Sequence, residues 1–460
     1  MPGKVHLTVL IVAAAVTAAG AQVRPTDLSA LTVQDAVAVA LRTNREIQQA
    51  REEVRRADYR ITEAKSAAFP QVNGAWSLER NLKPNVFVMS FPDSDGVMRK
   101  NRLKMGTDYN SSLGANLTQP LYVGGKVGTA LKAARVYRNL AAEGERLARQ
   151  GVILGTMQAF NGVLLARELE EIARASLTQA ERHLANVELR RQAGTATDYD
   201  LLRARVNAAN HRPRLIEAEN NARISLLRLK EVMGVDPATA VGVTGVFTAP
   251  DTTVLGRATA ELALSQRPDV TISRLTVELQ DKAVRIARGE FLPTLSATTT
   301  LAYNGNFDRL GYDGEDWSTY WTAGLNLTFP LFTGFRSSSK YQQAKIDRRQ
   351  AETELLKLRD AVTIEVEQGM MNLRQALAQI ASGSLNVDEA ARAVAIAENL
   401  YANGKATQLE VLDAQLALQV ARTNMASALH AGTMAEIALN KSLGLLDAAD
   451  NGGDNRKEQR

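Results

Sequence analysis

Hydrophobic residues recur at steps of three and four along a stretch in the second half of the chain. The stripe comprises Leu355, Leu358, Val362, Val366, Met370, Leu373, Leu377 and Ile380. This spacing places them on one face of a helix. The pattern runs from Phe335 to about Asn403, nearly 70 residues, and a helix of that length would measure on the order of 100 Å. A compact globule cannot contain such a rod, so the stripe is typical of a long, coiled-coil-like helix.

The placement of proline predicts a second long helix in the first half of the chain. No proline occurs between Leu121 and Arg212, or from Leu331 to the C-terminus. Proline disrupts helix interiors, and both stretches are rich in Ala, Leu, Glu, Gln and Arg, which favour helices. Each stretch is therefore free to form a very long helix.

Four other segments alternate apolar and polar residues, which is the pattern of a β-strand. They are residues 71–80, 109–119, 294–304 and 317–329. Each is roughly ten residues long, which suits a strand of a membrane β-barrel. Aromatic residues near the strand ends fit the membrane interfaces of such a barrel; they are Trp76, Tyr303, Trp317 and Trp321. On these segments alone, a soluble hairpin packed on the helices is the alternative.

The whole pattern occurs twice in the chain. Residues 114–124, GANLTQPLYVG, recur as residues 324–334, GLNLTFPLFTG, at an offset of 210. The same offset carries Gly194 onto Gly404, where each long helix is expected to turn back. A constant register over such a distance indicates an internal duplication.

The two copies differ in length before the first conserved block. Pro70 corresponds to Pro293 at an offset of 223, so the first copy has 13 extra residues between Pro70 and Pro120. An insertion of this size is tolerated most easily in an exposed loop. We therefore predict a longer surface loop in the first copy.

The N-terminus has the features of a secretory signal peptide. Lys4 precedes an apolar core at 7–19, and small residues precede Gln22, as at a cleavage site. No other stretch approaches the length of a transmembrane helix. The predicted organisation is a signal peptide at 1–21, a first repeat at 22–236, a linker at 237–257, a second repeat at 258–446 and a polar, disordered tail at 447–460.

Composition and charge argue against several classes of function. The chain has no cysteine, so it has neither disulfides nor thiolate metal ligands. Its net charge of +5 is too weak and dispersed to indicate nucleic-acid binding. His183, His211 and His430 are scattered along helices, and the glycines at 124–129 lack the order of a phosphate-binding loop. We predict no enzyme activity, no metal and no cofactor.

Four strands per chain cannot close a barrel, and open strand edges are not viable in lipid. Two chains would give an eight-stranded barrel filled by side chains, whereas three would give twelve strands around an aqueous lumen. A homotrimer therefore fits a transport pore better. The long helices would then project from the barrel as a tube and return at the glycine turns.

At this point the chain resembles the TolC-like outer-membrane efflux family over almost all of its mature length. The resemblance is carried by the two Asn-Leu-Thr-x-Pro-Leu-x-x-Gly blocks and by the two tip motifs at 190–202 and 401–415. It implies an α+β membrane protein with two tandem repeats. Four transmembrane strands per chain would enter a trimeric 12-stranded barrel, continued by a coiled-coil-like periplasmic tunnel.

The resemblance also implies a function and partners. The chain would be the outer-membrane exit duct of a tripartite efflux or type I secretion system in a Gram-negative bacterium, gated at its periplasmic helix tips. A periplasmic adaptor protein and an inner-membrane pump of the RND or ABC type would dock with it, and outer-membrane lipid would surround the barrel.

In that family, acidic residues beyond the second tip ring the periplasmic entrance, and Glu410 and Asp413 occupy the matching positions. Their spacing places both on one helix face. Asp200 corresponds to Glu410 in the first copy, but Arg203 replaces the second acid. An ordinary solvated helix face is the alternative for this pair.

The resemblance assigns adaptor docking to the tips, which include Arg190, Gly194, Thr197, Gly404 and Thr407. Family members often have an arginine two residues after the second tip glycine, as part of a latch between protomers. This chain has Ala406 there, beside Lys405, so a charged latch at that point is in doubt. The competing function is a periplasmic coiled-coil adaptor or scaffold without a barrel, which would not need four aromatic-flanked strands.

Overall fold

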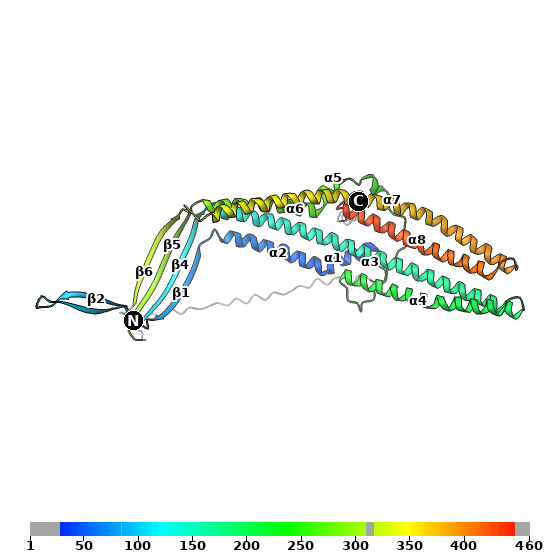
Figure 1. Cartoon of the computed structure of the whole chain (residues 1–460), viewed down its shortest axis with the longest axis horizontal. Coiled ribbons are helices and arrows are strands. Elements are labelled where there is room, and N and C mark those ends of the chain that lie inside the picture. Colours follow the sequence, from blue (N-terminus) through cyan, green and yellow to red (C-terminus); the bar gives the residue numbers. More distant parts are fainter. Residues whose placement is uncertain (1–27, 84, 310–316, 447–460) are drawn as a thin grey trace, which may run out of the picture.

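The computed structural model describes residues 28–83, 85–309 and 317–446. The predicted signal peptide and C-terminal tail lie outside these residues. Figure 1 shows an elongated molecule, with a β-sheet at one end and two helical hairpins at the other.

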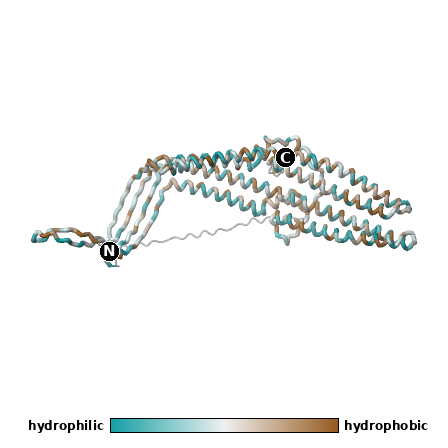
Figure 2. Tube along the Cα trace, viewed as in Figure 1, coloured by the Kyte–Doolittle hydropathy of each residue, from teal (hydrophilic) through white to brown (hydrophobic). Residues whose placement is uncertain are grey.

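Four long helices form the two hairpins. Helix α3 (Lys126–Gln192) pairs with α4 (Asp198–Met233), and α7 (Arg336–Ala402) pairs with α8 (Gln408–Ser442). Helices α3 and α7 have 67 residues each, so each is on the order of 100 Å long. The prediction of two very long helices is confirmed. In Figure 2, hydrophobic and hydrophilic residues alternate along them, as expected for helices with one packed face.

Each long helix begins at a left-handed turn that follows a strand. Gly124 and Gly125 precede α3 with φ of 64° and 71°, and Gly334 and Phe335 precede α7 with φ of 61° and 63°. A side chain at Gly124 would collide with the backbone carbonyl of Gly289. The repeated glycines therefore mark the point where strand changes to helix.

Helix α4 continues through Pro213, contrary to the expectation that proline limits the helices. Proline removes one backbone donor, so the carbonyl of Ala209 loses its helical partner. Pro213 and its neighbour Arg212 are exposed, so water can bind the released carbonyl group. The helix therefore tolerates Pro213 because this position faces water.

Shorter helices flank the long ones between their middle and the sheet (Figure 1). They are α1 (Val33–Thr43), α2 (Arg45–Ser66), α5 (Ala260–Gln266) and α6 (Pro268–Arg288), with single 3-10 turns at Leu28–Ala30, Thr253–Gly256 and Gly289–Phe291. Helix α2 packs on α3, and α6 packs on both α3 and α7. Within the described residues, no helix combines the length and hydrophobicity that a membrane span requires.

Two hydrophobic clusters hold the middle of the molecule together. The first includes Ile47, Val152, Phe160, Leu229 and Met233, and the second includes Val270, Val362, Leu373, Leu439 and Leu443. Leu229 and Leu439 are equivalent positions of the two repeats, and both are fully buried. Each repeat therefore supplies most of one cluster, and Leu446 of the second repeat joins the first cluster.

The main sheet contains the four predicted strands in the order β1-β4-β5-β6, all antiparallel. Their bounds are Gln71–Arg80, Tyr109–Val123, Thr294–Phe307 and Trp317–Thr328. Strands β4 and β5 join the two repeats, and β4 has an irregularity between Pro120 and Tyr122. The prediction of four strands in this sheet is confirmed.

The inserted residues of the first repeat do not form a simple loop. They form a second, two-stranded sheet from β2 (Asn85–Pro92) and β3 (Met98–Met105). Figure 1 shows this hairpin extending beyond the end of the main sheet that is farther from the helices. The insertion was correctly placed by its length difference, but its strand structure was missed.

Candidate functional site

One face of the main sheet is apolar across all four strands. The register aligns Trp76, Leu113 and Tyr303 in one row, and Gly74, Ala115, Leu301 and Trp321 in the next. The next row contains Val72, Leu117, Thr299 and Ala323, so a few hydroxyl groups lie among the apolar side chains of this face. More than half of each large side chain is exposed for Val72, Trp76, Leu113, Leu301, Trp321, Leu325 and Leu327. An exposed apolar face of this extent is typical of a surface that contacts lipid or protein.

Two of the indole groups on this face donate hydrogen bonds to neighbouring hydroxyls. The indole nitrogen of Trp76 donates to the Ser111 hydroxyl at 3.2 Å, and that of Trp321 donates to the Thr299 hydroxyl at 2.7 Å. Unsatisfied donors are costly in an apolar medium. The face is therefore built to meet hydrocarbon without exposing these indole N–H groups.

The opposite face of the sheet is polar. Two of its rows contain Asn73, Asn116 and Thr300, and Ser77, Ser112 and Asn304; the row between them contains Ala75, Gly114, Ala302 and Tyr320. The Asn116 side-chain amide donates to the Thr300 hydroxyl at 2.8 Å, and the Ser112 hydroxyl donates to Oδ1 of the Asn304 side chain at 2.7 Å. Alternation of an apolar and a polar face is the pattern of strands between lipid and a watery lumen.

The structure places the four predicted interface aromatics in one band. Trp76 and Tyr303 share a row, Trp317 stacks on Tyr303 with ring centroids 4.6 Å apart, and Trp321 lies one row closer to the helices. Phe307 and Tyr109 continue this band with stacked rings 5.9 Å apart. All of these residues lie in the half of the sheet that is remote from the helices.

A second aromatic band lies at the helical end of the sheet, and the sequence analysis did not identify it. It comprises the exposed residues Phe69, Tyr122, Phe291, Phe329, Phe332 and Phe335. These residues flank the strand ends at the glycine turns, so their proximity to the Pro-Leu-x-x-Gly blocks could have indicated them. Two aromatic bands at opposite ends of an apolar face are the arrangement of a membrane barrel.

The two hairpin tips are built in the same way. Gly194 and Gly404 have φ of 75° and 70°, which only glycine adopts easily. The amide of Thr195 donates to the carbonyl of Arg190 at 2.8 Å, and that of Lys405 donates to the carbonyl of Leu400 at 2.8 Å. These bonds close the C-terminal turn of each long helix. The predicted turns at the two glycines are confirmed.

Thr197 and Thr407 begin the return helices through capping boxes. The Glu410 carboxylate accepts the backbone amide of Thr407 at 2.7 Å, and the Asp200 carboxylate accepts that of Thr197 at 3.0 Å. The threonine hydroxyls accept the amides of Asp200 and Glu410 in return. The hydrogen bonds from Thr197 lower the pKa of Asp200. Both predicted gate acids therefore have a structural role.

Asp413 differs from Glu410 in its surroundings. It lies one turn further along α8, is exposed, and borders the depressions beside α4 and α7. Within the described residues, no hydrogen bond or ion pair of its carboxylate is found. Of the three predicted acids, Asp413 is the one whose charge no contact within the protomer engages.

The two tips touch each other through Arg190. Its guanidinium donates to the carbonyl of Ala402 at 2.5 Å and lies 4.6 Å from the centre of the Tyr401 ring. Gln408 strengthens the connection by donating to the carbonyl of Asp200 at 3.1 Å. Arg190, which the resemblance assigns to adaptor docking, thus also holds the first hairpin against the second within the protomer.

His183 lies behind this contact and is buried. Its ring centre is 5.6 Å from that of Tyr401, and its Nε2 atom has no hydrogen-bond partner among the described residues. Burial lowers the pKa of His183, although Glu398 opposes the shift. Burial therefore favours the neutral form of the imidazole.

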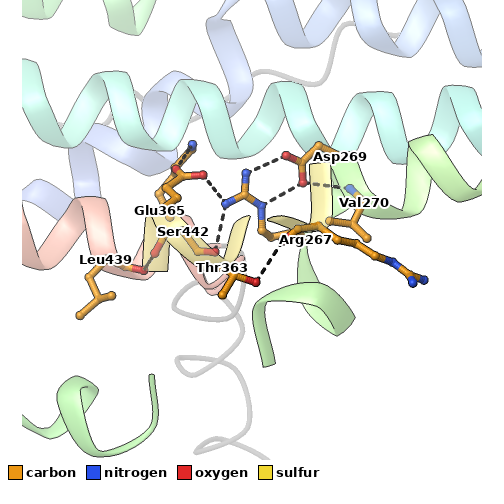
Figure 3. Close-up of polar contacts among 9 residues, drawn as sticks. Arg267, Asp269, Val270, Thr363, Glu365, Leu439 and Ser442 are labelled. Atoms are coloured by element: carbon orange, nitrogen blue, oxygen red, sulfur yellow. Dashed lines mark hydrogen bonds and ion pairs between the residues drawn. The ribbon is translucent and has the colours of Figure 1, made fainter. Parts of the chain in front are cut away.

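A charged cluster joins the helices of the second repeat near the middle of the molecule (Figure 3). Arg267 is buried and donates to the carboxylates of Asp269 at 2.7 Å and Glu365 at 2.6 Å, and to the carbonyl of Ser442 at 3.2 Å. Burial acts to raise the pKa of both carboxyls. Hydrogen bonds outweigh this effect, so the pKa of each carboxyl is lowered: Asp269 accepts from Arg267, and Glu365 accepts from Lys441 and Arg267.

The first repeat makes the equivalent connection without a charge. Asn44 corresponds to Arg267, and Val232 corresponds to Ser442. The Asn44 amide donates to the carbonyl of Val232 at 2.8 Å. The same helix junction is thus closed by an amide in one repeat and by a guanidinium in the other.

The histidines and acids do not form a site for metal. Within the described residues, no group of His, Cys, Asp or Glu side chains could hold a metal ion. The distinctive features of the structure are instead the sheet, with one apolar and one polar face, and the contact between the two hairpin tips.

Comparison with known proteins agrees with this geometry. The family described as "Outer membrane efflux protein" matches residues 36–235 and 259–445. Outer membrane efflux protein BepC of Brucella suis is 23% identical over 441 residues, which cover 95% of this chain and 91% of BepC. Outer membrane protein TolC of Vibrio cholerae is 26% identical over 399 residues, 85% of each chain.

A solved structure has the same fold. The CmeC outer membrane channel of Campylobacter jejuni has a TM-score of 0.74 with 20% sequence identity, over 93% of this chain and 89% of that chain. The two matched segments of the family correspond to the duplicated halves of the sequence. The chain therefore belongs to the outer membrane efflux protein family, whose members are channels of the outer membrane with a periplasmic helical part and not enzymes.

Proposed function

We propose that three copies of this chain form one exit duct through the outer membrane. The observation that carries the proposal is the two-faced sheet. Within the described residues, its edge strands β1 and β6 each pair with one neighbour only. Open edges cannot remain in lipid, so β6 of one protomer pairs with β1 of the next. Three protomers then close a barrel of twelve strands, with the apolar face outward and the polar face around the lumen.

The dimensions support this arrangement. Strand β6 has 12 residues, which is roughly 40 Å along the strand. A strand tilt of about 40° reduces this length to a height of roughly 30 Å, close to that of the apolar band of a membrane barrel. The helices add a tunnel on the order of 100 Å long.

The two repeats contribute equally to the duct. We keep the predicted boundaries, with repeats at 22–236 and 258–446 joined by the linker 237–257. Each repeat then supplies two strands and one helical hairpin. The duct has threefold symmetry between chains and approximate twofold similarity within each chain.

We also propose that the tips form the periplasmic gate. Asp413 and Glu410 of three protomers would surround the entrance, with Asp200 contributing beside them. The exposure of Asp413 and the ionised, capped state of Asp200 support an acidic ring that favours cations. The Arg190 contact with Ala402 and Tyr401 would hold the hairpins together in the closed state.

The first tip offers a surface for the periplasmic adaptor. Its exposed apolar side chains are Leu189, Tyr199, Leu202 and Val206, each more than half exposed. Gly194, Thr197, Gly404 and Thr407 set the turn geometry on which this surface depends. A partner helix with apolar residues at helical spacing would fit such a surface. The inner-membrane pump would supply the substrate through that adaptor.

Relatives support a role in efflux. BepC is described as an outer membrane efflux protein, and the sheet of this chain supplies an element that would span the membrane. A coiled-coil scaffold without a barrel would have no use for a sheet with an apolar face and paired indoles. We therefore favour the duct over the scaffold.

The proposal is tested by fractionation and by conductance. Full-length protein expressed in a Gram-negative host should be found in the outer membrane and require detergent for release. Recovery in the soluble periplasm would refute the duct. In planar bilayers, the wild type should prefer cations, and Glu410→Ala with Asp413→Ala should reduce that preference.

A matched control removes the same charge elsewhere. Asp388 and Glu389 are exposed acids of α7, away from the tip. Asp388→Ala with Glu389→Ala should leave the selectivity close to that of the wild type. Equal loss in both double variants would show that the acids act through net charge and not through a gate.

A further inference from the structure

The hairpin of β2 and β3 has two strands of unlike chemistry. Strand β2 reads NVFVMSFP and has no charged residue, whereas β3 reads MRKNRLKM and has four basic residues and no acid. One long edge of the ribbon is therefore apolar and the other is basic. Figure 2 shows hydrophobic colouring along part of this hairpin.

The apolar side chains of this ribbon have no cover within the protomer. Val86, Phe87, Val88 and Phe91 are each between 51% and 55% exposed. An isolated two-stranded hairpin is at best marginally stable in water. A surface that covers these side chains would stabilise the ribbon. The basic residues of β3 indicate that this surface is negatively charged.

The charge of the ribbon favours an anionic partner. Residues 82–106 contain five basic residues and two acids. One of the acids, Asp93, pairs with Arg99 at 3.2 Å beside the turn. Lys100 lies opposite Ser90 and Arg102 lies opposite Val88, so both basic residues occupy one face of the ribbon. Three such ribbons around one barrel would repel one another, which argues against their packing together over the lumen.

We propose that the ribbon of β2 and β3 binds the phosphate-bearing headgroups of the membrane surface around the barrel, with β2 immersed among the lipids. This proposal rests on the proposed function, because the barrel must first hold the sheet in the membrane. The ribbon leaves the end of the sheet that is remote from the helices, which is the external rim of the barrel. Long basic side chains can reach headgroups while neighbouring apolar side chains enter the interface.

The experiment uses a fluorescent probe on the ribbon. The chain has no cysteine, so Val88→Cys in the full-length protein gives a single labelling site for an environment-sensitive fluorophore. The labelled oligomer is reconstituted in vesicles of phosphatidylcholine, with or without phosphatidylglycerol, and brominated lipids quench probes that lie among the acyl chains. We expect a blue shift and strong quenching in the vesicles with phosphatidylglycerol, both reduced by added salt.

Removing the basic residues should release the ribbon. Each basic residue near an anionic surface strengthens binding by about fivefold, so Arg99→Gln, Lys100→Gln and Arg102→Gln together should lower the ratio of bound to detached ribbon by on the order of 100-fold. The control variant, Arg42→Gln with Arg45→Gln and Lys65→Gln, removes three exposed charges of α1 and α2. It should leave the quenching unchanged.

Three outcomes would overturn the proposal. A probe that stays in water in both kinds of vesicle would refute membrane contact. Quenching that is equal in both and insensitive to the triple substitution would refute headgroup recognition, and self-quenching between labelled protomers would show a lid of packed ribbons. A second probe at Leu325→Cys, on the apolar face of the main sheet, tests the duct separately. It must be quenched if the sheet lies in lipid, so quenching there without quenching on the ribbon would refute only the ribbon proposal.

Discussion

Replacing Arg190 with alanine should loosen the two hairpin tips. The substitution removes the hydrogen bond to the Ala402 carbonyl, 2.5 Å long, and the stacking of the guanidinium on Tyr401 at 4.6 Å. A hydrogen bond from a charged group contributes about 1.5–3 kcal/mol, and a cation–π contact at a partly exposed site contributes about 0.5–1 kcal/mol. Because Arg190 is only half-buried, we expect a net loss of about 2 kcal/mol in each protomer.

This loss should appear as a change in gating. If opening separates the first hairpin from the second, about 2 kcal/mol corresponds to roughly a 30-fold rise in the ratio of open to closed tips. Single-channel recording in planar bilayers measures this ratio as the open probability. Arg190→Lys should have an intermediate effect, because lysine can still donate a hydrogen bond but lacks the planar group that stacks on Tyr401.

The neighbouring arginine provides the control. Arg191 pairs with Asp198 at 2.6 Å, entirely within the first hairpin. Arg191→Ala should therefore leave the open probability close to that of the wild type. An unchanged open probability in Arg190→Ala, or an equal rise in both variants, would refute the assignment of Arg190 to the contact between the hairpins.

Other predictions concern the helix junctions and the tips. Arg267→Met leaves two carboxylates without their buried partner and should lower the apparent free energy of unfolding by about 3 kcal/mol. Asn44→Ala at the equivalent junction should lower it by about 1 kcal/mol. Guanidinium denaturation followed by circular dichroism compares the two variants, and equal losses would refute the idea that the buried charge makes the second junction more sensitive. Thr407→Ala removes a helix cap and should lower the apparent stability by about 1 kcal/mol, with faster amide exchange confined to the start of α8; unchanged exchange there would contradict the capping role. Burial lowers the pKa of His183 below its ordinary value of 6.5, so its contribution to stability is complete above that pH and is lost as the pH falls below it. The melting temperature should fall between pH 7.5 and 5.5 by more in the wild type than in His183→Gln, and parallel curves would refute this assignment.

The repeated patterns predicted the framework of the fold. Hydrophobic spacing located α7, the alternation of apolar and polar residues located the four strands of the main sheet, and the constant offset between the copies located both tips. These features depend on local periodicity, which a sequence displays directly. The hairpin of β2 and β3 was missed because it was inferred only from a difference in length, although NVFVMSFP is itself rich in residues that favour strands.

The candidate site was less predictable. Glu410 and Asp200 were read as gate acids, yet Thr407 and Thr197 three residues earlier were visible signatures of capping boxes. Arg190 contacts Ala402 across 212 residues of sequence, and no local pattern signals such a pairing. The sequence showed that aromatic residues are present in and near the strands. Only the register of the strands showed which of them lie at the same height in the sheet.

The two open edges of the sheet have a consequence for how the protein reaches its membrane. A single chain cannot enter lipid without exposing unpaired backbone groups along β1 and β6, so partial insertion is not a stable state. In the proposed duct, insertion must therefore accompany or follow the meeting of three chains. The rate of biogenesis should rise steeply with the concentration of newly exported protein, and a chain that finds no partners would remain available to periplasmic proteases.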